Sequence, residues 1–254
     1  MRTSPHISPF GIIGLLLLCG LLQACVAVDP GQTKEEKASA VNVQLGIGYL
    51  QQNNLDLASE KLTKALRQDP ESAPANNAYA ILQERLKQYD LAEYHYEKAT
   101  GLDKKNAQAA NNYGTFLCRH GRELESEKYF LRALDNPLYS TPEYAYTNAA
   151  ICLIKVNQVK PAREYLNKAL TEKSDFAPAL ITMARLSFEE EDFENAKTYL
   201  DRYHLVARPS ASSLWLDIRT SQLLDIDANV DELGQRLATD FPDSVEYKLW
   251  QEMQ

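Results

Sequence analysis

One pattern of small and large side chains recurs along this chain at intervals of about 34 residues. A small residue is followed four positions later by a large apolar one and, three positions further, by another small residue. The sets are Ala58, Leu62 and Ala65; Ala92, Tyr96 and Ala99; Ser126, Phe130 and Ala133; Ala162, Leu166 and Ala169; Ala196 and Leu200; and a degenerate pair, Val230 and Leu237. This spacing places each set on one face of a helix, so the pattern predicts a series of similar helices.

A second small position precedes the first five of these sets in the same register. Gly46 and Gly114 occupy it in two units, and Ala80, Ala150 and Ala184 occupy it in three others. A small residue is needed there because two helices cross closely. The period and these positions resemble the tetratricopeptide repeat (TPR). We predict an all-α fold, a right-handed TPR superhelix of about six helix-turn-helix repeats, since a generic amphipathic bundle explains six phased units poorly.

Prolines and a short insertion set the predicted boundaries. Proline ends a helix, and Pro70, Pro137, Pro209 and Pro242 lie in the expected turns. The spacing lengthens by two residues near 136–142, where a polar turn tolerates extra length. The predicted repeats are 39–72, 73–106, 107–142, 143–176, 177–210 and 211–244, followed by a capping helix at 245–254.

The sixth unit departs from the pattern. Gly234 stands where a large apolar residue belongs. The unit is followed by the final helix, and we expect Trp215 and Trp250 to pack over the open end of the stack, as terminal repeats commonly do.

The N-terminus has the layout of a secretory signal. Arg2 precedes a short apolar stretch, and Leu22-Gln23-Ala24-Cys25 resembles a bacterial lipobox. We predict a signal peptide at 1–24, lipidation of Cys25 and a flexible tether at 25–38; the alternative is a plain signal peptide with a chance cysteine. Acyl chains on Cys25 would anchor the protein in the outer membrane, because Val26, rather than an aspartate, follows the cysteine.

Charge and motifs argue against several classes of function. The net charge of −8, without a Lys/Arg cluster, argues against nucleic-acid binding. His95, His120 and His204 lie on separate repeats, so we expect no metal site, and the run from Glu189 to Asp192 is interpreted as a solvated turn. Peptidase, Walker-type and hydrolase motifs are absent. We expect no catalysis, no cofactor and no small-molecule substrate.

The organisation of the chain resembles that of one protein family. It combines a lipobox, a short tether and TPRs that fill the remaining chain. Three segments carry the resemblance: 43–50, 111–118 and 146–152. They are similar to the type IV pilus biogenesis and stability lipoproteins, the PilF/PilW-type pilotins. The resemblance implies a protein that binds the pilus secretin subunit in the periplasm, brings it to the outer membrane and promotes its multimerisation. Alternatives are a TPR lipoprotein of the β-barrel assembly machine and an adaptor that scaffolds cell-wall hydrolases.

Two cysteines remain in the repeats after the N-terminal ones are set aside. Cys118 and Cys152 each fall near the end of a first helix, in the third and fourth repeats. First helices of successive TPRs lie side by side, and two cysteines in an oxidising compartment usually pair. We predict a disulfide; the alternative is a pair of small buried hydrophobic residues.

The inner wall of a TPR stack is the expected partner site. TPR wall positions select Ala40, Val43, Ile47, Leu50 and Gln51 in the first repeat, Asn77, Ile81, Glu84 and Arg85 in the second, and Asn111, Thr115 and Arg119 in the third. The first set is apolar, which is typical of a groove for an amphipathic or extended segment. We expect an open groove because Leu45 and Tyr49 already supply core contacts; the alternative is that Val43, Ile47 and Leu50 are themselves packed.

Overall fold

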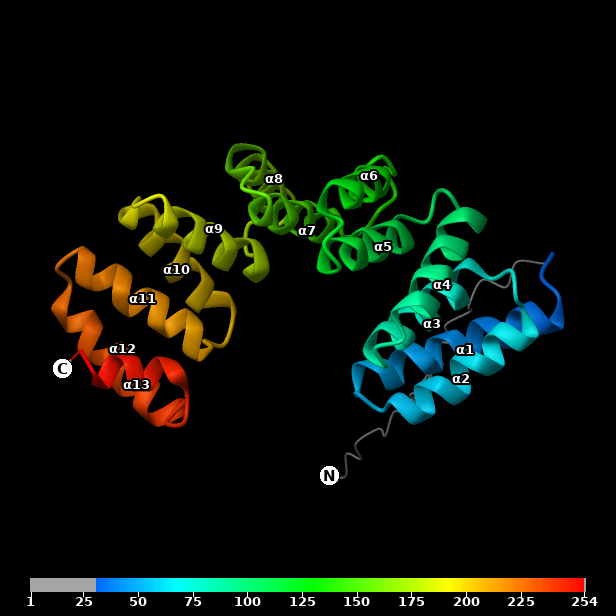
Figure 1. Cartoon of the computed structure of the whole chain (residues 1–254), viewed down its shortest axis with the longest axis horizontal. Coiled ribbons are helices and arrows are strands. Elements are labelled where there is room, and N and C mark those ends of the chain that lie inside the picture. Colours follow the sequence, from blue (N-terminus) through cyan, green and yellow to red (C-terminus); the bar gives the residue numbers. More distant parts are fainter. Residues whose placement is uncertain (1–30, 254) are drawn as a thin grey trace, which may run out of the picture. The chain divides into compact units, whose positions relative to one another are not determined.

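The computed structural model describes residues 31–253, and this part of the chain is helical, without strands. The predicted all-α TPR fold is confirmed (Figure 1). The helices are α1 (Lys34–Gln51), α2 (Leu55–Gln68), α3 (Ala73–Arg85), α4 (Tyr89–Leu102), α5 (Ala107–Arg119), α6 (Glu123–Leu134), α7 (Pro142–Lys155), α8 (Val159–Glu172), α9 (Ala177–Glu189), α10 (Phe193–Val206), α11 (Ala211–Leu223), α12 (Asp227–Asp240) and α13 (Val245–Gln251).

Odd- and even-numbered helices have different neighbours in the stack. Each odd helix from α1 to α11 packs against the even helix that follows it, which forms the helical hairpin of one repeat. Successive odd helices also contact one another, from α1 and α3 through to α9 and α11. The odd helices therefore form a continuous wall, and any groove along this wall crosses several repeats.

Within a repeat, a small residue on the first helix lies opposite a large side chain on the second. A Cβ added to Gly46 would fall 2.5 Å from Leu62, and one added to Gly114 would fall 2.9 Å from Phe130. Both large side chains are buried. The small residue of the first helix thus makes room for the large residue of the second, which is the close crossing that the sequence predicted.

The turn inside each repeat contains one residue in the left-handed region. These residues are Asn53, Lys87, Gly121, Asn157, Glu191 and Asp225, with φ between 56° and 79°. Only one of them is glycine, so the turn geometry is imposed by the repeat rather than by a flexible residue. The positions keep the spacing of the repeat and its two-residue insertion, which lies in the turn between α6 and α7.

The first helix begins earlier than the sequence suggested. α1 starts at Lys34, inside the segment 25–38 that was predicted to be a flexible tether, so this boundary is wrong at its C-terminal end. Glu35 and Glu36 lie in the first turn, where carboxylates interact favourably with the helix dipole. The predicted signal peptide at 1–24 and the predicted lipidation site, Cys25, lie outside the described residues. Within 31–253, none of the helices has the length and apolar character required to cross a bilayer.

Candidate partner-binding groove

The apolar patch predicted on the first helix is only partly open to solvent. Val43 and Leu50 are 5% and 4% exposed and pack in a core cluster with Leu62 and Leu82. Ile47 remains 39% exposed. The prediction that Val43 and Leu50 line an open groove is therefore wrong.

The prediction failed because the face of α1 that contains Val43 and Leu50 is the buried one. Ser39, Asn42, Val43, Gly46 and Leu50 form the buried stripe. Its two polar members are satisfied by α2, since the Ser39 hydroxyl donates to the carbonyl oxygen of Ala65 and the Asn42 amide donates to Gln68. The buried face is thus partly polar, and the hydrophobic pattern of this helix is misleading.

Leu45, predicted to supply core contacts, is instead 46% exposed. Tyr49 is partly buried against the core cluster, as expected. Ala40 and Gln51 are exposed. The large apolar side chains exposed on α1 are therefore Val41, Leu45 and Ile47.

In the second repeat, two of the predicted wall residues line an open cavity and two hold neighbouring helices together. Ile81 and Glu84 line an open cavity of about 460 Å³. Asn77 is buried and accepts a hydrogen bond from Asn112. Arg85 donates to the backbone carbonyl of Leu50 and so joins the end of α3 to the end of α1.

The cavity of about 460 Å³ lies over three first helices. Its lining comes from α3, α5 and α7, with one residue from α4 and the residue that caps α7: Ile81, Glu84, Tyr96, Gln108, Asn111, Asn112, Thr115, Arg119, Thr141, Tyr144 and Asn148. It includes Asn111, Thr115 and Arg119, the three residues that the TPR positions select in the third repeat. The open site is therefore centred on repeats two to four, beyond the apolar patch of the first repeat.

A carboxylate is held in a fixed position at one side of this cavity. The Tyr96 hydroxyl donates to one oxygen of Glu84 at 3.0 Å, and Arg119 donates to the other at 3.1 Å. Burial, followed by the nearby Glu84 carboxylate, raises the pKa of Tyr96 well above its usual range, so this hydroxyl stays a donor. Arg119 is 63% exposed at its side chain and leaves other N–H groups facing the cavity.

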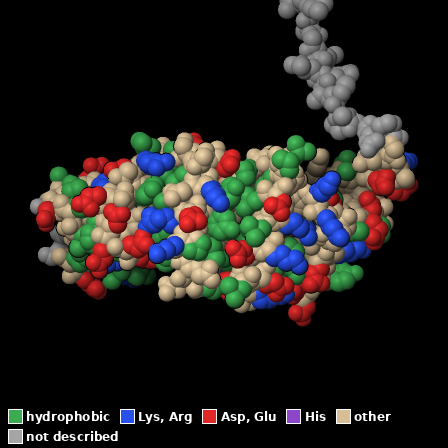
Figure 2. Space-filling model, turned by 90° about the horizontal axis from the view of Figure 1, so that it is seen from above, with side chains coloured by type: hydrophobic (Ala, Val, Ile, Leu, Met, Phe, Trp, Pro, Cys, Tyr) green, Lys and Arg blue, Asp and Glu red, His purple; other side chains and the backbone are tan. Residues whose placement is uncertain are grey.

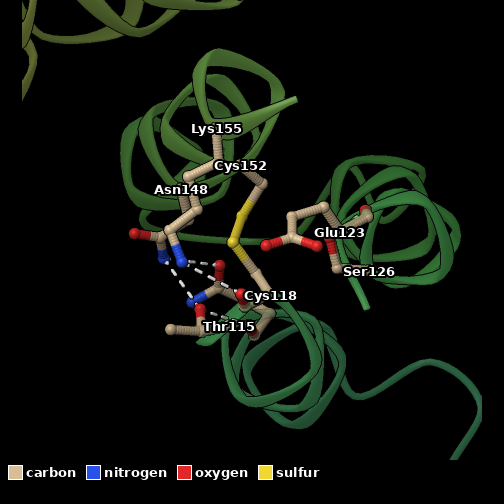
Figure 3. The surroundings of a disulfide bond; sticks show 8 residues. Thr115, Cys118, Glu123, Ser126, Asn148, Cys152 and Lys155 are labelled. Carbon is tan, nitrogen blue, oxygen red and sulfur yellow. Dashed lines mark hydrogen bonds between the residues drawn. A yellow bond between two sulfur atoms is a disulfide. The ribbon is translucent and has the colours of Figure 1, made fainter. Parts of the chain in front are cut away.

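Side-chain amides connect the first helices across the floor of the cavity. Gln108 donates to Asn112, which donates to Asn77 on α3. Asn148 on α7 donates to Asn111 at 3.1 Å and to Thr115 at 3.2 Å (Figure 3). These bonds fix the amides in place, and rigid amides are suited to hydrogen bonding with the backbone of an extended peptide.

A disulfide lies beside these amides. Cys118 of α5 and Cys152 of α7 are bonded, with their Cα atoms 5.8 Å apart, and Lys155 donates to the carbonyl oxygen of Cys118 (Figure 3). Both cysteines line a smaller cavity of about 160 Å³. The bond therefore ties together the third and fourth repeats at the wall of the groove.

Four cavities follow one another along the first helices because neighbours share lining residues. Thr115, Arg119 and Asn148 belong to both the first cavity and the one at the disulfide. Ile151 and Lys155 belong to that cavity and to one of about 360 Å³ between α7 and α9. The latter shares two residues, Arg185 and Glu189, with a fourth cavity between α9 and α11. We call this continuous series, from Ile81 to Arg219, the wall groove.

The sequence reasoning missed the C-terminal half of the wall groove. The TPR positions used for the first three repeats, continued into the fourth to sixth, select residues that line it: Tyr144, Ile151, Ile154, Lys155, Arg185, Phe188, Glu189, Ser212, Trp215 and Arg219. The signal was therefore present in the repeat register.

The groove differs in charge from the rest of the surface. On the face seen in Figure 2, acidic and basic side chains are interspersed with hydrophobic ones, and the chain as a whole carries a net charge of −8. The groove contains four cations, Arg119, Lys155, Arg185 and Arg219, and two anions, Glu84 and Glu189. Among residues 31–253, no group of three or more His, Cys, Asp or Glu side chains is placed to hold a metal ion.

Comparison with known proteins gives consistent results along the chain. A tetratricopeptide-repeat family model matches residues 43–107. Over 240 residues the chain is 31% identical to the type IV pilus assembly protein PilF of Pseudomonas aeruginosa, covering 93% of this chain and 95% of PilF.

Two solved structures agree with that match. The structure of Pseudomonas aeruginosa PilF superposes with a TM-score of 0.79 at 30% identity, covering 87% of this chain and 100% of that chain. The crystal structure of PilW, a widely conserved type IV pilus biogenesis factor, superposes with a TM-score of 0.76 at 30% identity, covering 83% and 97%.

Proposed function

Because this chain belongs to the PilF/PilW-type TPR proteins of type IV pilus biogenesis, we propose that it binds the secretin subunit of the type IV pilus. Bound secretin subunits are delivered to the outer membrane and multimerise there. The observation that carries this proposal is similarity to PilF over nearly the full length of both chains, with the wall groove inside the matched region.

The mechanism that we propose is tethering without catalysis. Acyl chains on Cys25 hold the repeats at the periplasmic face of the outer membrane. A partner bound in the wall groove is then confined to the membrane surface, which raises its effective concentration and favours its assembly. Neither a cofactor nor a nucleic acid takes part.

Co-purification from detergent-solubilised outer membranes tests the partner and the site together. Thr115→Trp places a large side chain in the groove, where Thr115 lines two of its cavities. Thr171→Trp is the matched control, since both threonine hydroxyls donate to the carbonyl four residues earlier, at 2.8 and 2.9 Å. Thr171 is exposed on α8, away from the groove.

We expect the unmodified chain and Thr171→Trp to capture the secretin subunit, and Thr115→Trp to lose it. Recovery of β-barrel assembly subunits or of cell-wall hydrolases, without secretin, would contradict the proposal and favour one of those alternatives. Equal secretin capture by all three chains would retain the partner but exclude the wall groove as its site.

A further inference from the structure

We propose that the C-terminal half of the wall groove, over repeats four to six, binds an extended segment in which an acidic side chain recurs at about every third residue, with large apolar ones in between. This inference rests on the proposed function only in taking the groove as a protein-binding site. It names the chemistry of the bound segment, which the relationship to PilF leaves open.

Three cations of this half have no carboxylate partner among residues 31–253. Lys155, Arg185 and Arg219 are exposed, and none of them takes part in an ion pair there. Lys155 donates one hydrogen bond to a backbone carbonyl, which leaves two N–H groups. The guanidinium of Arg219 lies 4.7 Å from the ring centre of Phe188 and keeps its edge available. Each cation can therefore donate hydrogen bonds to a carboxylate of a bound segment.

Apolar side chains lie between these cations. Ile154 shares a cavity with Lys155 and Arg185, and Phe188 and Trp215 share the next cavity with Arg185 and Arg219. All three apolar side chains are partly exposed. An apolar side chain of a ligand placed in either cavity would be covered on one side by hydrocarbon and flanked by positive charge.

The spacing of the helices suggests the spacing of the acidic residues. The three cations belong to the successive first helices α7, α9 and α11, and packed helices lie about 8–10 Å apart. An extended polyproline II chain advances about 3.1 Å per residue and has three residues per turn, so every third side chain points to the same side. A carboxylate at about every third residue would therefore meet successive cations, with apolar side chains in between.

Charge complementarity selects an acidic occupant over a neutral or basic one. The protein as a whole carries a net charge of −8, which disfavours binding of an acidic segment. In the C-terminal half of the groove, three unpaired cations face a single carboxylate, Glu189. An acidic segment is therefore attracted to this half specifically, which favours recognition of one register.

Selection of a random dodecapeptide phage library on the full chain, purified in detergent, tests the inference without using secretin. The test variant combines Lys155→Glu, Arg185→Glu and Arg219→Glu. The control combines Lys104→Glu, Lys160→Glu and Lys248→Glu, which are exposed cations outside the wall groove. Both variants change the net charge equally, and circular dichroism melting checks that both are folded.

We expect enriched peptides with acidic residues at about every third position and large apolar residues between them. A synthetic enriched peptide should bind the control with unchanged affinity, bind the test variant at least about tenfold more weakly, and lose affinity as salt increases. Enrichment without acidic residues, no enrichment, or equal binding to both variants would overturn the inference. None of these outcomes bears on secretin capture, so the proposed function is tested separately.

Discussion

The indole of Trp250 lies directly against Gly234, so closely that a Cβ added to this glycine would fall 2.2 Å from the Cζ2 atom of the ring. In the preceding repeats the small residue is on the first helix and the large one is on the second. The sixth repeat reverses this order, with Ile218 on α11 and Gly234 on α12. Trp250, from α13, thus occupies the space above the glycine and covers the end of the stack.

Gly234→Ala should loosen the C-terminal cap. The added methyl group overlaps the indole, and overpacking of this kind costs about 1–3 kcal/mol. Trp215 and Trp250, the only tryptophans of the chain, both pack at this end, so their fluorescence reports on it directly. Gly101→Ala is the control, since a Cβ there meets nothing within 4 Å. An unchanged urea midpoint for Gly234→Ala, followed by tryptophan emission, would contradict this packing.

Two glycines of α1 should respond in opposite ways to replacement by alanine. Gly46→Ala places a methyl group 2.5 Å from Leu62 and should destabilise the first repeat by about 1–3 kcal/mol. Gly48→Ala meets nothing within 4 Å and should stabilise the same helix by about 0.5–1 kcal/mol. A double-mutant cycle with Leu62→Ala, measured by urea unfolding, should show coupling for Gly46 alone. Additive free energies would exclude the contact.

Removal of the disulfide should destabilise the repeats without unfolding them. Cys118 and Cys152 are 34 residues apart, and closing a loop of this length stabilises a protein by about 3–4 kcal/mol. We expect Cys118→Ser with Cys152→Ser to unfold at lower urea concentration, and reductant to lower the midpoint of the unmodified chain only. In the denatured, non-reduced mature repeats, without Cys19 and Cys25, two free thiols would show that the bond is not formed in the protein.

Cys25→Ser should release the protein from the membrane. The prediction depends on the lipobox at the end of the apolar N-terminal stretch, because the acyl chains are the proposed anchor. Cell fractionation should place the variant in the soluble periplasm with the helical content of the unmodified repeats. Co-fractionation of the variant with the outer membrane would show that another feature holds it there.

Acidification should destabilise the second repeat through His95. Burial, followed by the charge of Lys98, lowers the pKa of His95 below its ordinary value of 6.5, and its Nδ1 lies 2.8 Å from Oδ1 of Asn76. The unfolded chain therefore binds a proton at this histidine more readily than the folded chain does. The contribution of neutral His95 to the free energy of unfolding is present above pH 6.5 and is lost as the pH falls below it.

The variant His95→Gln should reduce that loss. Unfolding free energies measured on both sides of pH 6.5 should fall less steeply for the variant than for the unmodified chain. Parallel pH profiles would assign the dependence to other groups.

The repeat fold follows from the sequence because it depends on local patterns that recur. The spacing of the small and large residues identifies the hairpins and predicts a close crossing of their two helices, which the approach of Phe130 to Gly114 confirms. The same register brings the ends of α5 and α7 together, which is why Cys118 and Cys152 were expected to meet.

Only the tertiary structure decided which face of α1 is buried and where the groove lies. The packing of α1 against both α2 and α3 buries Ser39 and Asn42 with satisfied hydrogen bonds and leaves Leu45 exposed, contrary to the hydrophobic pattern. Likewise, the sequence shows that the sixth repeat has Gly234 where the pattern has a large residue. It does not show that Trp250 fills the space above this glycine. Both outcomes depend on which helices become neighbours, and a pattern within one helix does not contain that information.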